Sequence, residues 1–187
     1  MTTPRPHTLR IIGGKYKGKL IPVLAEEGLR PTPDRFRETI FNWLQGKLEH
    51  ARVLDLFAGS GALGFEALSR GAVELTLVDL NASCCTTLKK LATDFDPAAI
   101  KIFNCAALSF LEHASSCYDV VFLDPPYKLK ILEQVMASLL KNNLIHQNSL
   151  IYVEMRNGSC AFFPGWEQLR ESCSGQVKAT LWKKTSF

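Results

Sequence analysis

A regular alternation of apolar and amphipathic runs occupies residues 52–155 and constrains the fold more than any other feature of the chain. Apolar runs of strand length are expected at 52–57, 73–80, 99–105, 118–124 and 149–155. Runs with helical spacing lie between them, at 62–71, 81–95, 107–114 and 128–143. Strands that are each followed by a helix pair in parallel, because the helix carries the chain back across a face of the sheet. The sequence therefore predicts an α/β fold with helices on both faces of a parallel sheet.

The segments on either side of this region predict two hairpins. "TLRIIGG" (8–14) and "GKLIPV" (18–23) are typical of short strands around a glycine-containing turn. "WEQLRESC" (166–173) and "QVKATLWKK" (176–184) are separated by two residues, so no helix fits between them and they must enter the sheet antiparallel. The expected architecture is Rossmann-like, with a mostly parallel seven-stranded sheet, an antiparallel C-terminal hairpin strand and a short N-terminal β-hairpin.

A helix is expected over 35–48, with Asp34 in position to cap it. Its apolar residues recur at helical spacing and should face the core: they are Phe36, Ile40, Phe41 and Leu44. We expect two parts, a hairpin and loop extension over 1–33 and the main domain over 34–187.

Composition narrows the classes of protein to which the chain can belong. A chain of 187 residues with 47% hydrophobic and 21% charged residues suits one globular domain. It has no run of about 18 apolar residues and its first residues lack the apolar block of a signal peptide, so we expect a cytoplasmic protein without a membrane span. The six cysteines form no Cys-x-x-Cys pair and the four histidines are scattered, so we expect no metal site and no disulfide framework.

Positive charge is concentrated at one end of the chain. Residues 1–37 hold eight basic and three acidic residues, a net charge of +5, whereas the remainder holds 14 basic and 15 acidic residues. Such asymmetry favours a polyanionic partner, although a solvated surface explains the charge count equally well. The candidate phosphate contacts are Arg10, Lys15, Lys17, Lys19, Arg30, Arg35 and Arg37.

The first strand of the alternating region runs into a glycine-rich loop, "DLFAGSGALG". Gly59, Gly61 and Gly64 match the pattern G-x-G-x-x-G, which lets the backbone approach a ligand at the start of a helix. A nicotinamide cofactor would fit this loop, with Asp79 about 20 residues further on to hold its ribose. Asp55 at the loop entrance would repel a pyrophosphate and attract an ammonium group. S-adenosylmethionine (SAM), which has a sulfonium, an ammonium, a ribose and no phosphate, suits these residues better.

Both acids also have a structural interpretation. Asp55 can cap a helix or a turn. Asp79 can cap the helix that follows it, although Asn81 is equally placed to do so.

The fourth expected strand ends in "DPPY", residues 124–127. The Asp124 carboxylate and the Pro125 carbonyl can accept hydrogen bonds from an exocyclic amino group and hold its lone pair ready for attack. Pro126 helps to fix the backbone and removes a competing amide donor, and Tyr127 offers a flat face on which a base can stack. The alternative is a turn in which the prolines only end the strand.

The sequence resembles the RsmD-type methyltransferases over nearly its whole length. The resemblance is carried by "RIIGGKYKGKLIPV", "GLRPTPDRFRETIFNWL", "LDLFAGSGALGFEALSRGA", "LVDLN", "FLDPPY", "LIYVE" and the terminal hairpin with "GQV". It implies a class I SAM-dependent fold and methyl transfer to the exocyclic N2 of one guanine in 16S ribosomal RNA. It also implies that the substrate is the RNA in the small ribosomal subunit or in an assembly intermediate. Separately from the resemblance, a chain of one domain is expected to be a monomer.

The resemblance also assigns residues to the site. It implies that the methionine part of SAM lies against Asp55, Phe57, Ala58, Gly59, Ser60 and Gly61. The ribose and adenine would contact Asp79, Leu80, Cys105, Ala106 and Ala107, and the amino group would contact Asp124, Pro125, Pro126 and Tyr127. The N-terminal hairpin and the "RPT" loop would cover the pocket and hold RNA. Ala106 departs from the family, which often has a polar residue there, so backbone amides would replace a side-chain contact to adenine, with Asn104 as an alternative.

Two other functions agree with the same residues. DPPY is shared by amino-group methyltransferases that act on DNA and on protein. The chain could also be a catalytically silent RNA-binding assembly factor that holds SAM structurally.

Overall fold

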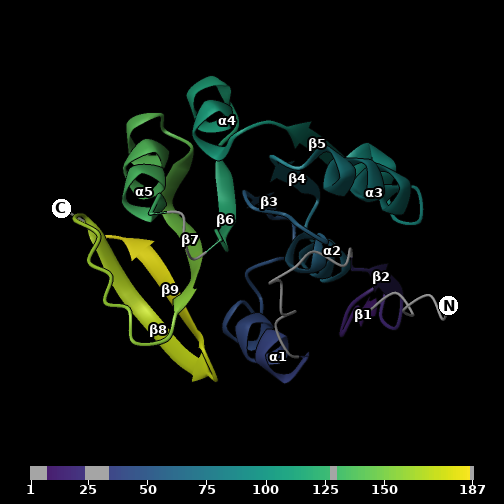
Figure 1. The fold of residues 1–187 in the computed structure, drawn as a ribbon, viewed down its shortest axis with the longest axis horizontal. Coiled ribbons are helices and arrows are strands. Elements are labelled where there is room, and N and C mark those ends of the chain that lie inside the picture. Colours follow the sequence, from purple (N-terminus) through teal and green to yellow (C-terminus); the bar gives the residue numbers. More distant parts are fainter. Residues whose placement is uncertain (1–7, 24–33, 127–129, 186–187) are drawn as a thin grey trace, which may run out of the picture.

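The computed structural model describes residues 8–23, 34–126 and 130–185, whose strands form two sheets (Figure 1). The small sheet pairs β1 (Thr8–Arg10) with β2 (Leu20–Pro22). The strands of the large sheet are β3 (Arg52–Asp55), β4 (Glu74–Asp79), β5 (Ile100–Asn104), β6 (Tyr118–Leu123), β7 (Ile145–Arg156), β8 (Trp166–Ser174) and β9 (Val177–Lys184). The helices are α1 (Asp34–Trp43), α2 (Ala62–Ser69), α3 (Ala82–Ala92), the short 3₁₀ helix η1 (Pro97–Ala99), α4 (Ala107–His113) and α5 (Leu132–Lys141).

The large sheet has the strand order β5-β4-β3-β6-β7-β9-β8. The first five strands in sequence, β3 to β7, run parallel, and β9 lies antiparallel between β7 and β8. This arrangement confirms the predicted parallel sheet and its antiparallel hairpin. The order reverses between β3 and β6, because the chain builds outward through β4 and β5 before it returns to the other side of β3. Ligands of open parallel sheets bind at the carboxyl ends of the strands near such a reversal.

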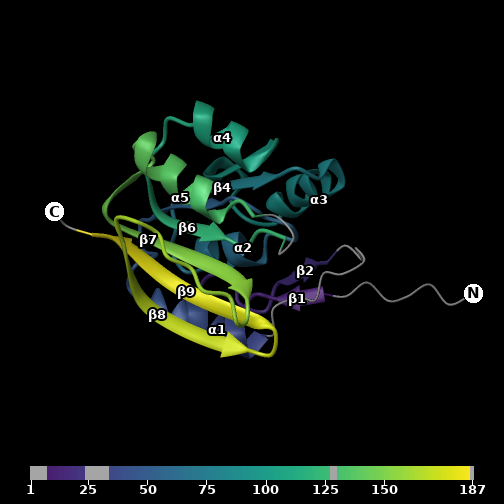
Figure 2. The same ribbon diagram turned by 60° about the vertical axis from the view of Figure 1, so that its left-hand side comes forward.

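Alternate residues of each strand enter two separate cores. Val53, Val120 and Phe122 face the core shared with the hairpin β1-β2, α1, α2 and α3. Leu54 and Val121 face the opposite core, which α4 and α5 cover. Figure 2 shows α4 and α5 on one side of the sheet and α1 on the other. The four apolar residues of α1 that were predicted to face the core are buried, Phe36, Ile40, Phe41 and Leu44.

Element boundaries differ from the predicted ones where backbone geometry intervenes. The α-helix α1 ends at Trp43 rather than near residue 48. The next turn has hydrogen bonds that span three residues instead of four, such as the one from the Lys47 amide to the Leu44 carbonyl, and Gly46 has a φ of +71°. Strand β7 begins at Ile145, four residues earlier than 149, with an irregular register against β6.

A buried carboxylate holds the N-terminal hairpin against α2. Glu66 is fully buried, and its Oε2 accepts the amide of Ile12 at 2.7 Å while its Oε1 accepts the amide of Gly13 at 2.9 Å. The guanidinium of Arg70, one helical turn further on, donates from Nε to Oε1 at 2.7 Å. The carboxylate therefore satisfies two amides that secondary structure does not use.

The end of α2 continues this attachment. The Ser69 hydroxyl accepts the amide of Tyr16 at 2.9 Å and donates to the Gly13 carbonyl at 2.5 Å, and the Ser69 carbonyl accepts the amide of Lys15 at 2.7 Å. Gly14 has a φ of +77°, and a Cβ at this position would lie 1.8 Å from the Ser69 carbonyl oxygen. Only glycine permits this contact between the hairpin turn and α2.

We predict that Glu66→Gln lowers the free energy of unfolding by about 2–4 kcal/mol, because an amide cannot accept both backbone N–H groups and leaves Arg70 without its charge partner. Urea unfolding followed by circular dichroism measures this change. The control is Glu112→Gln on the exposed surface of α4, which should change the value by less than about 0.5 kcal/mol. Equal effects of the two substitutions would contradict the anchoring role of Glu66.

Candidate functional site

Four carboxyl groups gather at the carboxyl end of the large sheet. Asp55 ends β3, Asp79 ends β4, Asp124 directly follows β6, and Glu154 lies near the end of β7. Side chains two residues apart on a strand share a face. All four therefore belong to the face that carries the core of α1, α2 and the hairpin. This end of the sheet includes the reversal between β3 and β6.

The glycine loop between β3 and α2 lies at the same edge. Gly59 has a φ of +51°, and a Cβ added to it would meet no atom within 4 Å, so the loop has open space beside it. Gly64 is required for a different reason, because a Cβ there would lie 2.6 Å from the side chain of Leu77. Of these two glycines, Gly59 is the one that borders space for a ligand.

Asp79 fixes the position of the glycine loop. Its Oδ2 accepts the amide of Gly59 at 2.7 Å and its Oδ1 accepts the amide of Asn81 at 2.8 Å. Asn81 is the residue that caps α3, through its Oδ1 and the amides of Ser83 and Cys84. The capping role considered for Asp79 therefore belongs to Asn81. Each Asp79 oxygen retains a lone pair that can accept a ribose hydroxyl.

Asp55 is buried and does bind the start of a helix. Its Oδ2 accepts the amide of Gly64, in the first turn of α2, at 3.1 Å. Burial, and then the negative charge of Asp79, raises the pKa of Asp55 to about 7 against the lowering effect of amide hydrogen bonds from Gly64 and Phe57. Asp55 therefore does cap the start of α2, as the structural interpretation predicted. The hydrogen bond from Gly64 lowers the pKa of Asp55 by less than burial raises it.

Asp124 and Glu154 occupy neighbouring strands. Leu123 pairs with Val153 in the parallel register, so Asp124 and Glu154 are the next residues on each strand. Asp124 is half-buried, and its pKa is raised well above the ordinary value by burial and then by the carboxylates of Glu154 and Asp55.

Glu154 is only 4% exposed, and its Oε2 accepts the hydroxyl of Tyr152 at 3.0 Å. No role was predicted for Glu154 from the sequence. The signal was present, since an acid in the apolar run 149–155 is unusual for a buried strand.

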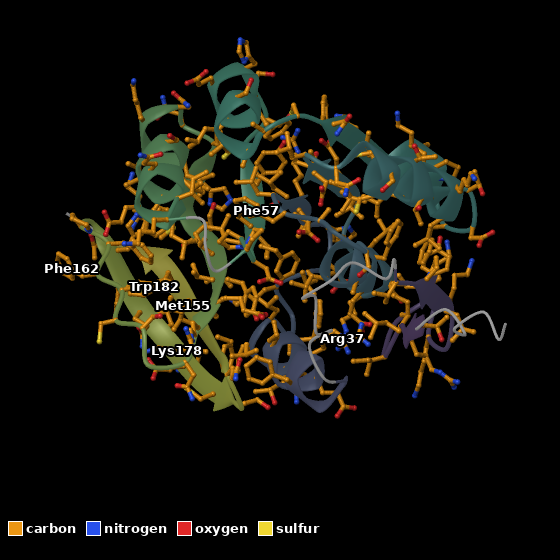
Figure 3. The ribbon with its side chains drawn as sticks, in the orientation of Figure 1. Arg37, Phe57, Met155, Phe162, Lys178 and Trp182 are labelled. Carbon is orange, nitrogen blue, oxygen red and sulfur yellow. The ribbon has the colours of Figure 1, made fainter. Side chains whose placement is uncertain are left out.

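The remaining candidate residues surround the ends of β3, β4 and β5. Asn104 pairs with Asp79 across the two strands, and its amide nitrogen donates to the carbonyls of Asp79 and Leu80 at 3.0 and 2.9 Å. Asn104 therefore joins two strand ends. Leu80 is 74% exposed, as an apolar contact to a flat ligand requires. The other candidates here differ in exposure: Phe57, Ser60 and Cys105 are half-buried, Ala106 is exposed, and Ala58, Gly61 and Ala107 are buried (Figure 3 labels Phe57).

The DPPY segment is described as far as residue 126. Pro125 is buried and Pro126 is exposed. Tyr127 lies outside the described residues, so its stacking role remains a prediction.

The basic candidates divide into two groups. Arg10, Lys15 and Lys17 are exposed on the hairpin. Lys19 is half-buried, with its ammonium 4.7 Å from the ring centroid of Phe95 and donating to the Asp94 carbonyl. Arg30 and the side chain of Arg35 lie outside the described residues.

Arg37 does not belong with the exposed group. It is 1% exposed, lies between α1 and the hairpin (Figure 3), and donates from Nη2 to the Arg10 carbonyl at 2.8 Å. The prediction that Arg37 contacts phosphate is therefore wrong, because its guanidinium does not reach the surface. Its role is structural.

A separate hollow of about 580 Å³ lies at the opposite, amino edge of the sheet, where His146 contacts Asp119 at 2.7 Å. None of the candidate site residues lines it. Within the described ranges no cluster of histidine, cysteine and acidic residues could hold a metal ion, and no helix is long and apolar enough to cross a membrane.

The raised pKa of Asp55 predicts a specific dependence of stability on pH. A native-state pKa of about 7 means that the folded protein binds the proton more tightly than the unfolded chain. The resulting stability is fully present below about pH 4 and is lost as the pH rises through about 7, at up to about 1.4 kcal/mol per pH unit.

We therefore expect Asp55→Asn to gain stability relative to the unaltered protein between pH 4 and pH 8, by up to about 4 kcal/mol. Urea unfolding at several pH values measures the difference, with Glu112→Gln as the control. A difference that stays constant with pH would show that Asp55 does not retain its proton.

Comparisons with known proteins agree with this geometry. Residues 9–183 match the family model described as Conserved hypothetical protein 95. Ribosomal RNA small subunit methyltransferase D of Haemophilus influenzae is 41% identical over 180 residues, which cover 94% of this chain and 93% of that protein. The Escherichia coli K12 protein of the same name is 40% identical and covers 94% of this chain and 90% of its own length. The solved structure of Escherichia coli yhhF is 37% identical, with a TM-score of 0.85, and covers 95% of this chain and 98% of that one.

The acids and the glycine loop of this chain meet at the reversal of a parallel sheet, and the matches cover nearly its whole length. Together they show that the protein belongs to the RsmD-type family of SAM-dependent methyltransferases.

Proposed function

We propose that this protein transfers a methyl group from SAM to the exocyclic N2 amino group of a guanine in 16S ribosomal RNA. The observation that carries the proposal is the position of Asp124 and Pro125, which directly follow β6 at the reversal of the sheet, beside the carboxyl cluster. The small-subunit substrate is supported by the relatives named ribosomal RNA small subunit methyltransferase D.

The residues present fit SAM. The open space beside Gly59 admits a ligand close to the backbone, and the lone pairs of Asp79 can accept ribose hydroxyls. Burial and neighbouring carboxylates raise the pKa of Asp55 and of Asp124, and a ligand that carries a sulfonium and an ammonium favours the ionised form of both. When bound, SAM supplies an electrophilic methyl group, so that the protein needs to supply orientation and proton acceptance.

Asp124 and Pro125 orient the amino group. The carboxylate and the carbonyl each accept one N–H, which turns the nitrogen lone pair toward the methyl group. A proline at 126 donates no amide hydrogen to compete for these acceptors. Stacking of the base on Tyr127 would contribute about 1–3 kcal/mol. A base within a helix must leave its stack to reach such a site.

The exposed basic residues of the hairpin form the surface that we propose for RNA, namely Arg10, Lys15 and Lys17 together with the half-buried Lys19. Glu66 and Ser69 hold this hairpin on α2, whose first turn binds Asp55 of the cofactor site. RNA on the hairpin would thus lie on an element fixed to the methyl-transfer site. The proposed organisation is an RNA-holding extension over 1–33 and a methyltransferase domain over 34–187, acting as a cytoplasmic monomer on the subunit or an assembly intermediate.

Replacing Asp124 with Ala should reduce methyl transfer by about 10²–10⁴-fold while RNA affinity is retained, because the amino group loses its acceptor and its orientation. Mass mapping of 16S RNA measures the outcome in cells that lack the native protein and produce either Asp124→Ala or the control Glu112→Ala. One guanine should lack its methyl group with Asp124→Ala and regain it with the control.

Full methylation by Asp124→Ala would refute the role of Asp124. Absence of any RNA methyl change in cells without the protein would instead favour a DNA or protein substrate, or a non-catalytic assembly factor.

Reversal of charge on the hairpin should weaken RNA binding in a salt-dependent way. Each phosphate contact that is lost reduces the slope of log affinity against log salt by about 0.7–0.9, so Lys15→Glu with Lys17→Glu should reduce it by about 1.4–1.8. Lys47→Glu with Lys141→Glu, exposed on other parts of the surface, is the matched control for net charge. If both pairs change the slope equally, the hairpin is not the RNA surface.

A further inference from the structure

Asp124 and Glu154 are placed side by side by the pairing of β6 with β7. The parallel register sets Phe122 opposite Tyr152 and Leu123 opposite Val153. The rings of Phe122 and Tyr152 touch edge to face at 5.9 Å between centroids, which fixes the two strands just before the acids. Side chains two residues apart on a strand point to the same face, so the carboxyls of Asp124 and Glu154 lie on the same face as the two rings.

Glu154 is held in a defined orientation in this arrangement. It is 4% exposed, and the Tyr152 hydroxyl donates to its Oε2 at 3.0 Å. Two neighbouring carboxyls, one buried and one half-buried, do not ionise independently, because the second negative charge is opposed by the first. Sharing one proton is the arrangement that leaves a single charge between them.

We propose that Glu154 shares one proton with Asp124 in the free protein, and that this pair accepts the proton which the amino group loses during methylation. The second half of this inference rests on the proposed function. Asp124 is the residue that touches the amino group, and Glu154 is a positioning residue that acts through it.

The step balances in atoms and charge. The amino nitrogen forms a bond to the methyl carbon, and the carbon–sulfur bond breaks with its electron pair left on sulfur. The nitrogen then loses one N–H proton to the carboxyl pair, whose charge changes from −1 to 0. The positive charge of the donor disappears in the same step, so the site has the same total charge before and after transfer. The pair returns the proton to water afterwards.

Other charged groups near the pair contribute to its titration. Burial and the charges of Glu154 and Asp55 raise the pKa of Asp124, in that order. Asp79, on the far side of Asp55, raises the pKa of Asp55 itself. On β9, the register partner of Glu154 is Ala179, and Lys178 beside it contacts Glu171 at 3.0 Å.

Two substitutions should move the titration of Asp124 in opposite directions. Glu154→Gln removes the neighbouring charge and should lower the midpoint by about one pH unit or more. Tyr152→Phe keeps the ring but removes the hydrogen bond that favours ionised Glu154, and should raise the midpoints of the pair. Carbon-13 NMR of the side-chain carboxyls in the free protein measures both, with Glu167→Gln, exposed on β8, as the control.

The rate of methyl transfer in a single turnover, measured against pH, should shift in the same directions as the NMR midpoints. Unchanged midpoints in Glu154→Gln would overturn the proposal. If Glu154→Gln fails to fold, Tyr152→Phe tests the proposal in its place. Midpoints that fall or stay unchanged in Tyr152→Phe would contradict the shared proton.

Failure of this inference is distinguishable from failure of the proposed function. If the methyl group is found on an atom other than an amino nitrogen, the proposed function fails and with it the role of the pair as proton acceptor, while the NMR shifts still test the shared proton. If the product is an N-methyl guanine and the midpoints do not move, the function stands and the role of Glu154 is refuted.

Discussion

The crowding of carboxyl groups at the end of a parallel sheet is the constraint on which the rest of the site depends. Asp55, Asp79, Asp124 and Glu154 come from four adjacent strands and share one face, so each is partly withdrawn from water beside like charges. The consequence is that the pKa of Asp55 and of Asp124 is raised in the free site, and that a cation which enters the site favours their ionised forms. A methyl donor with a positive sulfur atom suits such a site better than a ligand with phosphates.

The short helix α2 connects this site to the N-terminal hairpin. Its first turn donates the Gly64 amide to Asp55, and its later residues Glu66 and Ser69 bind the backbone of residues 12–16. The hairpin carries the exposed basic residues but has only three residues in each strand, which is too little for independent stability. Its attachment to α2 explains how a small basic element keeps a fixed position.

The alternating pattern and the local motifs were sufficient to predict the sheet, both hairpins and the residues of α1 that face the core. They were not sufficient for Arg37, which carries the same charge as its neighbours but is buried against the Arg10 carbonyl. They also left open whether Asp79 or Asn81 caps α3, because both are close enough in sequence. The structure assigns the cap to Asn81 and gives Asp79 to the amide of Gly59.

The sequence by itself determined the order of strands and helices, the glycine loop and the DPPY turn, because each depends on residues close together in the chain. Tertiary structure alone decided that Glu154 would lie beside Asp124, thirty positions away, and that Glu66 would bind the hairpin more than fifty positions earlier. Strand register and helix docking bring these groups together, and neither follows from local spacing. Burial then alters the chemistry of the acids, since removal of water from neighbouring carboxyls opposes their ionisation.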